Sequence, residues 1–406
     1  MNGNKYDYDA IIIGAGIGGL VCGCYLAKAG LKTLIVEKNA QPGGYCTSFT
    51  RGGFTFDACA HSLGSLREGG ILNTVLSELD LKGRIQFERY DPSDIIITPD
   101  LKINIYNDLA KTIQEFQKYF PEESISVNNF FDFVNKISGS ELSSLAKQPF
   151  SNILDKYFKD KKLKAIISMP ILGNAALPPS KVSAFTALTL YKEFILDGGY
   201  YPINDMQEFP NKLAQKISEL GGKIVNLRKV KKIEVDENIA KGVILDDGSF
   251  ISAKYIISNA DTRQTFIDML DKKYVTNNFV KKIDNMIPSL SAFVIYMGMD
   301  NAFKTEYNNS TIWYMPHYDI EKMYVTAING NIENIDWFLM KYYDKKNVLQ
   351  LFFNMPYIDS NYWKNNKDEV SKNLLEKAKK IFPDMFIKAK YIDSASPYSL
   401  YNWTNR

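Results

Sequence analysis

The residues best suited to chemistry form a glycine-rich turn close to the N-terminus. Gly14, Gly16 and Gly19 have the spacing G-x-G-x-x-G, between an apolar run at residues 10–13 and a helical pattern that extends through Ala29. Gly14 allows a tight turn, Gly16 lets the backbone approach a pyrophosphate, and Gly19 lets the helix pack close to the strands. The free N–H groups and the positive dipole of the helix N-terminus then face the phosphates.

An acidic residue completes this unit. A second apolar run at residues 33–36 ends on Glu37. A carboxylate at this place accepts hydrogen bonds from ribose hydroxyls and repels the 2′-phosphate of NADP. The sequence therefore predicts a Rossmann-type dinucleotide site, with a purely structural glycine turn as the alternative.

The same stretch resembles a membrane segment only in its length. Residues 10–27 carry no charge. The length of this uncharged run is about the lower limit for a helix that spans a bilayer. Five glycines interrupt the run, and Asp7 and Asp9 stand where a signal peptide would have basic residues. We therefore expect a buried strand followed by a core-facing helix.

The composition is that of a globular protein with more than one domain. The chain has 406 residues, of which 45% are hydrophobic and 23% charged. A net charge of +3 with scattered basic residues gives no reason to expect nucleic acid as a partner. The four cysteines all precede residue 60 and have neither metal-ligand nor disulfide-framework spacing, so we expect no metal site and a cytoplasmic, reducing location.

The order of the remaining segments predicts two interleaved domains. A hairpin at residues 45–57 precedes a mostly helical stretch at 70–195, and a helix at 205–220 leads into strands around a turn at 246–248. Aromatic-rich strands follow at 290–298, 311–315 and 348–354, with a helix at 367–381 and a strand at 387–392. The predicted fold class is α/β, with residues 1–85 and 196–265 forming the nucleotide-binding domain. Residues 86–195 and 266–406 would form an α+β substrate domain with an antiparallel sheet and a helical insertion.

Motifs along nearly the whole chain carry a family resemblance. They are Gly14-Ala15-Gly16-Ile17-Gly18-Gly19-Leu20, Glu37 followed by Gly43-Gly44, Phe56-Asp57 through His61, residues 198–202, residues 230–233, and Ile257-Ser258-Asn259-Ala260-Asp261. In this order the chain resembles the FAD-dependent oxidoreductases that include phytoene desaturase, carotenoid isomerase and retinol saturase, which are related more distantly to the amine oxidases. The pair Gly43-Gly44, six residues after the acid, distinguishes these FAD proteins from plain NAD-binding units.

The resemblance implies FAD as the cofactor and a set of residues that hold it. Val230 would give main-chain contacts to the adenine, and the Asn259-Ala260-Asp261 turn would close near the phosphates. Three positions depart from the family pattern: Tyr45 replaces a common arginine, Cys59 replaces a glycine, and Asn204-Asp205 replaces a glycine pair. The predicted cofactor-binding residues are Gly14, Ala15, Gly16, Gly18, Gly19, Glu37, Lys38, Gly43, Gly44, Val230, Asn259 and Asp261.

His61 is the candidate for a catalytic side chain. In such enzymes the flavin does the redox work, so a hydride acceptor and a dry channel matter more than a cluster of acids and bases. His61 could transfer a proton, or it could serve in packing or hydrogen bonding. Aromatic residues of the later strands could line an apolar tunnel or form ordinary core, and the apolar helical stretch at 183–196 could touch a membrane or pack inside.

The resemblance predicts an FAD-dependent oxidoreductase that acts on carbon–carbon bonds of a hydrophobic polyene, such as a carotenoid or isoprenoid, by desaturation, isomerisation or saturation. An amine oxidase-like enzyme and a non-catalytic flavin- or lipid-binding protein are the alternatives. A peripheral contact with the inner face of the membrane is expected, and the oligomeric state stays open. Residues 396–405 resemble a segment that in relatives precedes a glycine-rich stretch closing the flavin site, and the sequence stops at Arg406. We therefore expect that closing segment to be absent, and this form to hold flavin weakly and to turn over little or not at all.

Overall fold

A computed structural model describes residues 6–405 except 302, 304 and 308. The predicted strand, helix and strand at the start of the chain are confirmed as β1 (Tyr8–Ile13), α1 (Ile17–Lys28) and β2 (Thr33–Val36). β1 and β2 pair in parallel, and nearly all of their residues are buried. Continuous burial explains why residues 10–13 and 34–36 of these strands are apolar at successive positions and do not alternate.

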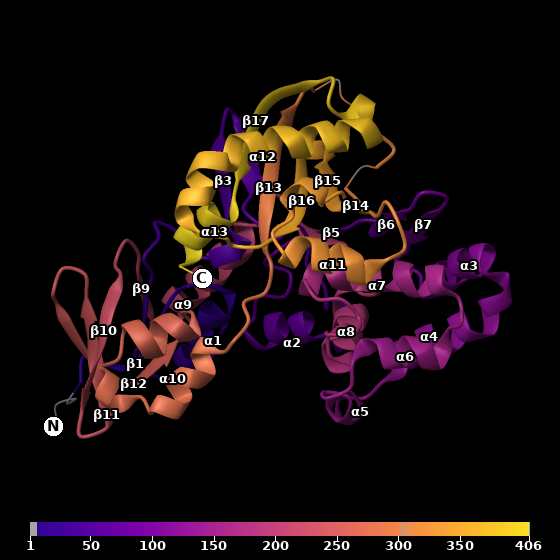
Figure 1. The fold of residues 1–406 in the computed structure, drawn as a ribbon. Helices are drawn as coiled ribbons and strands as arrows, with labels where there is room; N and C mark the ends of the chain where they lie inside the picture. Colours follow the sequence, from indigo (N-terminus) through magenta and orange to yellow (C-terminus); the bar gives the residue numbers. More distant parts are fainter. Residues whose placement is uncertain (1–5, 302, 304, 308, 406) are drawn as a thin grey trace.

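β1 and β2 belong to a six-stranded sheet with the order β10-β11-β12-β1-β2-β9. Its other strands come from a much later part of the chain: β9 (Lys223–Val225), β10 (Val230–Asp236), β11 (Ile239–Leu245) and β12 (Phe250–Ser258). β12 pairs in parallel with β1, and β10, β11 and β12 form an antiparallel meander (Figure 1). α1 and α9 (Glu208–Glu219) pack together beside this sheet, and a Cβ at Gly23 would lie 2.7 Å from a methyl of Ile35.

A second sheet has seven strands in the order β17-β13-β16-β15-β14-β6-β7. All neighbours in it are antiparallel except β14 and β6, which are parallel. Its strands are β6 (Asp94–Ile97), β7 (Lys102–Ile105), β13 (Ser291–Met299), β14 (Thr311–Tyr314), β15 (Phe338–Tyr343), β16 (Val348–Met355) and β17 (Ala389–Ala395). The α/β fold class with an antiparallel second sheet, predicted from the sequence, is thereby confirmed.

Helices fill the space around the sheets, and Figure 1 shows α3 to α8 gathered on one side. They are α2 (Ile71–Glu78), α3 (Leu109–Tyr119), α4 (Ser124–Lys136), α5 (Gly139–Ser144), α6 (Phe150–Tyr157), α7 (Lys161–Ala175), α8 (Ala184–Leu190), α10 (Asn277–Asp284), α11 (Ile320–Ile328), α12 (Ser360–Ile381) and α13 (Pro397–Thr404). α12 packs Trp363 against Phe293 of β13, with ring centroids 5.9 Å apart. α7 reaches the opposite face of the seven-stranded sheet, where Asn354 of β16 donates to the carbonyl of Leu172.

The structure corrects part of the predicted helical stretch. Residues 87–105 form β5 (Phe87–Arg89), β6 and β7, and β5 pairs with β8 (Tyr200–Pro202). Strands of three or four residues are too short for periodicity to separate them from helix. The predicted hairpin is confirmed as β3 (Ser48–Arg51) and β4 (Phe54–Asp57).

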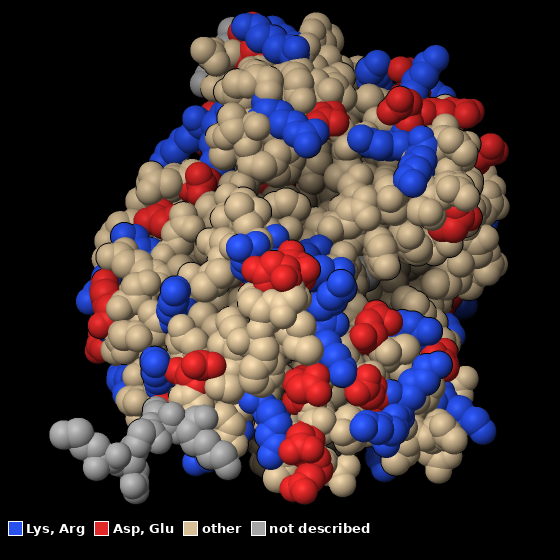
Figure 2. Space-filling model, turned by 90° about the vertical axis from the view of Figure 1, so that its left-hand side faces the viewer, with Lys and Arg blue, Asp and Glu red and all other residues tan. Residues whose placement is uncertain are grey.

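The surface and the helices give two further findings. On the face shown in Figure 2, Lys and Arg are interspersed with Asp and Glu, so no single sign of charge dominates this face. Among the residues that the structure describes, no helix combines the length and the apolar character needed to cross a bilayer. In the stretch at 183–196, Ala184, Leu188 and Ile195 are buried, whereas Phe185 is 39% exposed.

Candidate functional site

The glycine turn links β1 to α1 and leaves no room for side chains. Gly14 has a φ of +94°, a region that favours glycine. A Cβ on Gly19 would lie 2.2 Å from the carbonyl oxygen of Gly14. The turn and the first turn of the helix therefore touch directly, and any larger residue at Gly19 would push them apart.

Asn259 lies over this turn, and the sequence did not predict this contact. It follows β12, and its N–H donates to the carbonyl of Ile13 at 2.9 Å. A Cβ on Gly16 would lie 2.9 Å from Nδ2 of Asn259, and one on Gly18 would lie 2.9 Å from Oδ1. Both glycines thus leave room for the Asn259 amide as well as for a close ligand, and a polar group is placed at the N-terminus of α1.

Glu37 is held at the end of β2 by two backbone amides. Its carboxylate is buried and accepts from the N–H of Ala15 at 2.7 Å and from that of Asn39 at 2.8 Å. The carbonyl of Glu37 accepts from the N–H of Arg228 at 2.9 Å, which brings the segment before Val230 to the same edge. Val230 itself is buried as the first residue of β10.

The second glycine pair lies against the first turn. Gly43 has a φ of +129°, and its N–H donates to the carbonyl of Ala15 at 2.8 Å. Gly43 and Gly16 form a parallel bridge. Asp261, after Asn259, accepts from the N–H of Arg263 at 2.8 Å. The structure therefore gathers the predicted residues at the ends of β1, β2 and β12.

α13 covers the loops of this site, and it is formed by the segment whose resemblance placed it before the stretch that closes the flavin site in relatives. Trp403 donates from Nε1 to the carbonyl of Gly44 at 3.0 Å, and the hydroxyls of Tyr45 and Thr404 are 3.1 Å apart. Lys38 points toward the same helix, because its Nζ donates to the carbonyl of Asn402 at 2.9 Å. Burial lowers the pKa of Lys38.

His61 lies on the seven-stranded sheet among aromatic rings. Its ring centroid is 5.7 Å from that of Phe352, 6.1 Å from that of Phe194 and 6.4 Å from that of Trp313. Nε2 is buried and has no hydrogen-bond partner within the described part of the chain. Burial, together with the charge of Lys341, lowers the pKa of His61 to about 3, so the imidazole is neutral at pH 7.

The segment from Asp57 to His61 is fastened to the sheet by side chains from distant strands. Gln350 donates to the carbonyl of Asp57 at 2.7 Å, Tyr296 to that of Ala58 at 2.7 Å, and Tyr343 to that of His61 at 3.2 Å. The Asp57 carboxylate accepts from Ser48 and Tyr201 and lies 3.6 Å from Nζ of Lys346. Sequence reasoning missed these partners; the available signal was the polar residue inside each apolar strand.

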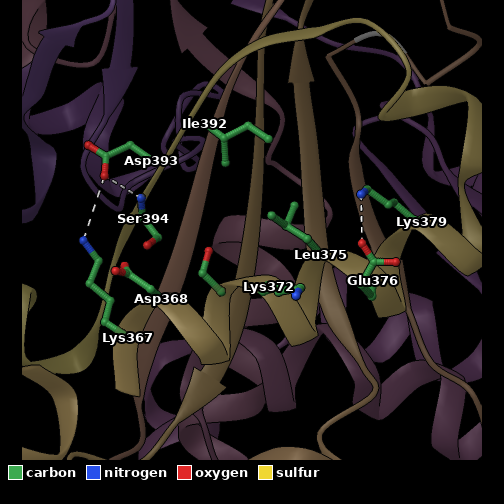
Figure 3. Close-up of a pocket in the computed structure, with 10 residues that line it drawn as sticks. Lys367, Asp368, Lys372, Leu375, Glu376, Lys379, Ile392, Asp393 and Ser394 are labelled. Carbon is green, nitrogen blue, oxygen red and sulfur yellow. Dashed lines mark hydrogen bonds and ion pairs between the residues drawn. The ribbon is translucent and has the colours of Figure 1, made fainter. Parts of the chain in front are cut away.

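A surface groove between α12 and β17 has none of these features. It encloses about 310 Å³, and its charged residues pair with each other, as Lys379 does with Glu376 and Lys367 with Asp393 (Figure 3). No predicted site residue lines it. The groove is therefore not part of the candidate site.

The site at the glycine turns fits a dinucleotide such as FAD. The first amides of α1 have no acceptor within the helix, so they are available to a pyrophosphate. Glycines at 14, 16, 43 and 44 let the two turns and Asn259 pack closely together, and the Glu37 carboxylate is fixed where ribose hydroxyls are expected. Among the described residues, no group of His, Cys, Asp and Glu suits a metal ion.

Comparison with known proteins agrees with this geometry. The chain is 29% identical over 325 residues to prolycopene isomerase 2 of an Oncidium hybrid cultivar, covering 72% of this chain and 55% of the relative. It is 25% identical over 347 residues to the all-trans-retinol 13,14-reductase of Rattus norvegicus, covering 75% and 56%. The chain thus spans little more than half the length of these curated relatives.

Solved structures share the fold. A triple mutant of putrescine oxidase superimposes with a TM-score of 0.66 at 15% identity, covering 98% of this chain and 86% of the other. The family model described as flavin containing amine oxidoreductase matches residues 17–404. This match confirms the predicted FAD cofactor, and the chain belongs to the flavin-containing amine oxidoreductase family.

Proposed function

We propose that this protein is an FAD-dependent oxidoreductase that changes carbon–carbon bonds of a hydrophobic polyene, such as a carotenoid or another isoprenoid. The observation that carries the proposal is the surrounding of His61, a neutral imidazole among the rings of Phe194, Trp313 and Phe352. These rings are largely buried, and such a dry, aromatic environment would suit an apolar chain. The names of the two curated relatives, an isomerase of prolycopene and a reductase of retinol, support the same substrate class.

The roles of the chain's own residues follow from their positions. The amides of α1, the Gly43-Gly44 loop and Glu37 would hold the cofactor, and Asn259 would place its amide near the phosphates. FAD, when bound, supplies hydride transfer. His61 would orient the polyene through its ring faces, because a pKa of about 3 keeps the imidazole neutral, and a neutral imidazole does not protonate a polyene at pH 7.

We further propose the predicted division into two interleaved domains, at residues 1–85 with 196–265 and at 86–195 with 266–406. The distribution of strands supports this division. The six-stranded sheet takes its strands from residues 8–36 and 223–258, whereas the seven-stranded sheet takes its strands from 94–105 and 291–395.

A peripheral contact with a membrane, at a cytoplasmic location, is also proposed. Met286 and Ile287, after α10, are 51% and 84% exposed, and Lys281 and Lys282 lie in the last turn of that helix. An apolar pair beside cations suits an anionic lipid surface. Co-sedimentation with phosphatidylglycerol vesicles should fall in Ile287→Asp and stay unchanged in Ile239→Asp, a matched change at another exposed isoleucine.

Activity is tested with the FAD-loaded protein and the substrates that the relatives' names contain. Prolycopene and all-trans-retinol are incubated with the reduced protein without oxygen, and the products are separated by chromatography and mass spectrometry. We expect an isomerised or saturated polyene. Oxidation of putrescine with no change in either polyene would contradict the proposal. We do not expect this result, because the buried ammonium group of Lys341 near His61 would repel a protonated amine.

A further inference from the structure

A row of polar side chains crosses the seven-stranded sheet in register. The paired residues are Asp393 of β17, Tyr296 of β13, Gln350 of β16, Lys341 of β15, Thr311 of β14 and Asp94 of β6. Residues paired directly across neighbouring strands project from the same face of a sheet. This face lies beneath the segment from Asp57 to His61, to which Gln350 and Tyr296 donate hydrogen bonds.

Most of the row has ordinary partners. Tyr296 donates to the carbonyl of Ala58, and Asp94 accepts from Nε1 of Trp313 and from the hydroxyl of Ser93, each at 2.8 Å. These bonds satisfy the polar groups of the row at both ends of its buried part. The middle of the row is different.

Lys341 has no hydrogen-bond or ion-pair partner within the described residues, although it is 0% exposed. Its Nζ lies 5.2 Å from the ring centroid of Tyr90 and 5.5 Å from that of Tyr343. Oε1 of Gln350, the direct neighbour of Lys341 across the strands, is also buried without a partner. Buried donors and acceptors are normally hydrogen-bonded, so these atoms on two directly paired residues are available to one shared polar group.

The chemistry of that group follows from the two orphaned atoms. Nζ of Lys341 needs an acceptor, and Oε1 of Gln350 needs a donor. A hydroxyl group satisfies both atoms, a carboxylate satisfies only the first, and an ammonium group would be repelled by Lys341. The next row on the same face of the sheet holds Trp313, Leu339 and Phe352. The rest of a molecule whose hydroxyl group binds here would therefore meet apolar side chains.

We propose that Lys341 and Gln350 bind the hydroxyl group of an otherwise apolar substrate. The inference rests on the proposed function and narrows its substrate class from polyenes in general to hydroxylated polyenes. The ring of His61 contacts Trp313 and Phe352. His61 therefore lies where the apolar part of the bound substrate would begin.

The test compares two probes that differ in one group. All-trans-retinol and axerophthene, its counterpart without the hydroxyl, are titrated into the FAD-loaded full chain, and binding is followed by quenching of tryptophan fluorescence. We expect retinol to bind about 10- to 100-fold more tightly, because the hydrocarbon leaves a charged donor unpaired. In Lys341→Met the two probes should bind within about threefold of each other, since neutral Met removes the unpaired charge.

Lys345→Met is the matched control, because Lys345 lies four residues away with its side chain 60% exposed and paired with Glu88. It should keep the full preference for retinol. Lys341→Gln is the second variant: it keeps a neutral donor and should retain a preference of about threefold. Equal binding of both probes by the unmodified protein would overturn this inference alone, whereas binding of neither would overturn the proposed function as well.

Discussion

The glycine turns and the face of the seven-stranded sheet hold polar groups in opposite ways. At the turns, backbone amides satisfy the charge of Glu37, which accepts from Ala15 and Asn39. On the sheet, Lys341, Gln350 and His61 each keep a buried atom without a partner among the described residues. The first region is complete without a substrate, and the second has unpaired groups that a substrate could bind. The difference teaches that a cofactor site can be built from local backbone geometry, whereas substrate selection here depends on side chains from distant strands.

Gly19→Ala is expected to have the largest effect, because it breaks the first region. The new Cβ would lie 2.2 Å from the carbonyl oxygen of Gly14, and neither backbone segment can move freely. We expect the variant to bind FAD far more weakly than the unmodified chain and to lose about 3 kcal/mol of unfolding free energy. Absorbance at 450 nm and urea unfolding measure both effects.

Gly139→Ala is the control for this change, since nothing lies within 4 Å of a Cβ at that position. It should retain FAD and stability. Full FAD content in Gly19→Ala would show that the turn is more adaptable than its contacts indicate.

The pH dependence of stability tests how well the second region, the face of the seven-stranded sheet, excludes water from His61. The folded pKa of His61 lies near 3 because of burial, below the unfolded value of about 6.5. As the pH falls, the unfolded chain therefore takes up a proton before the folded chain does. The stability that comes from this shift in the pKa of His61 is complete above pH 6.5 and is lost toward pH 3. Between pH 8 and pH 5 we expect a loss of about 2 kcal/mol of unfolding free energy from this group.

His61→Phe should remove that component when urea unfolding is repeated from pH 8 to pH 5. The other histidine, His317, provides the control, and His317→Asn should keep the full pH dependence. An unchanged slope in His61→Phe would show that the imidazole is more open to water than its buried Nε2 indicates.

Trp403→Phe tests the contact between α13 and the glycine loops and should have the smallest effect. It removes the hydrogen bond to the carbonyl of Gly44 and keeps an aromatic ring. A partly exposed bond of this kind contributes about 1 kcal/mol, so FAD affinity should fall about fivefold. Isothermal titration of the apoprotein with FAD measures the change, and Trp363→Phe, remote from the loops on α12, should leave the affinity unchanged.

The sequence predicted the first region well because its signals are contiguous. β1, α1, β2 and the hairpin β3–β4 lie where the patterns placed them, within a few residues. β15 was missed: it is buried at all six positions, with Lys341 in the middle of an otherwise apolar and aromatic run. A lysine in such a run reads as a solvent-facing residue, and nothing local reveals that it is aligned with Gln350 and Asp94. Sheet register between distant strands is the information that the sequence lacks.

The covering of the glycine loops by α13 has a consequence for the order in which the protein matures. Lys38 and Asn402, which meet there, are 364 residues apart in the chain. During synthesis the nucleotide-binding turn leaves the ribosome early, but the helix that covers its loops is made several hundred residues later. Cofactor capture by the nascent chain would therefore be weak and reversible, and tight capture would wait until this helix has been made and has packed against the loops. FAD content measured after expression thus reports how many chains finished folding, as well as how strongly each one binds.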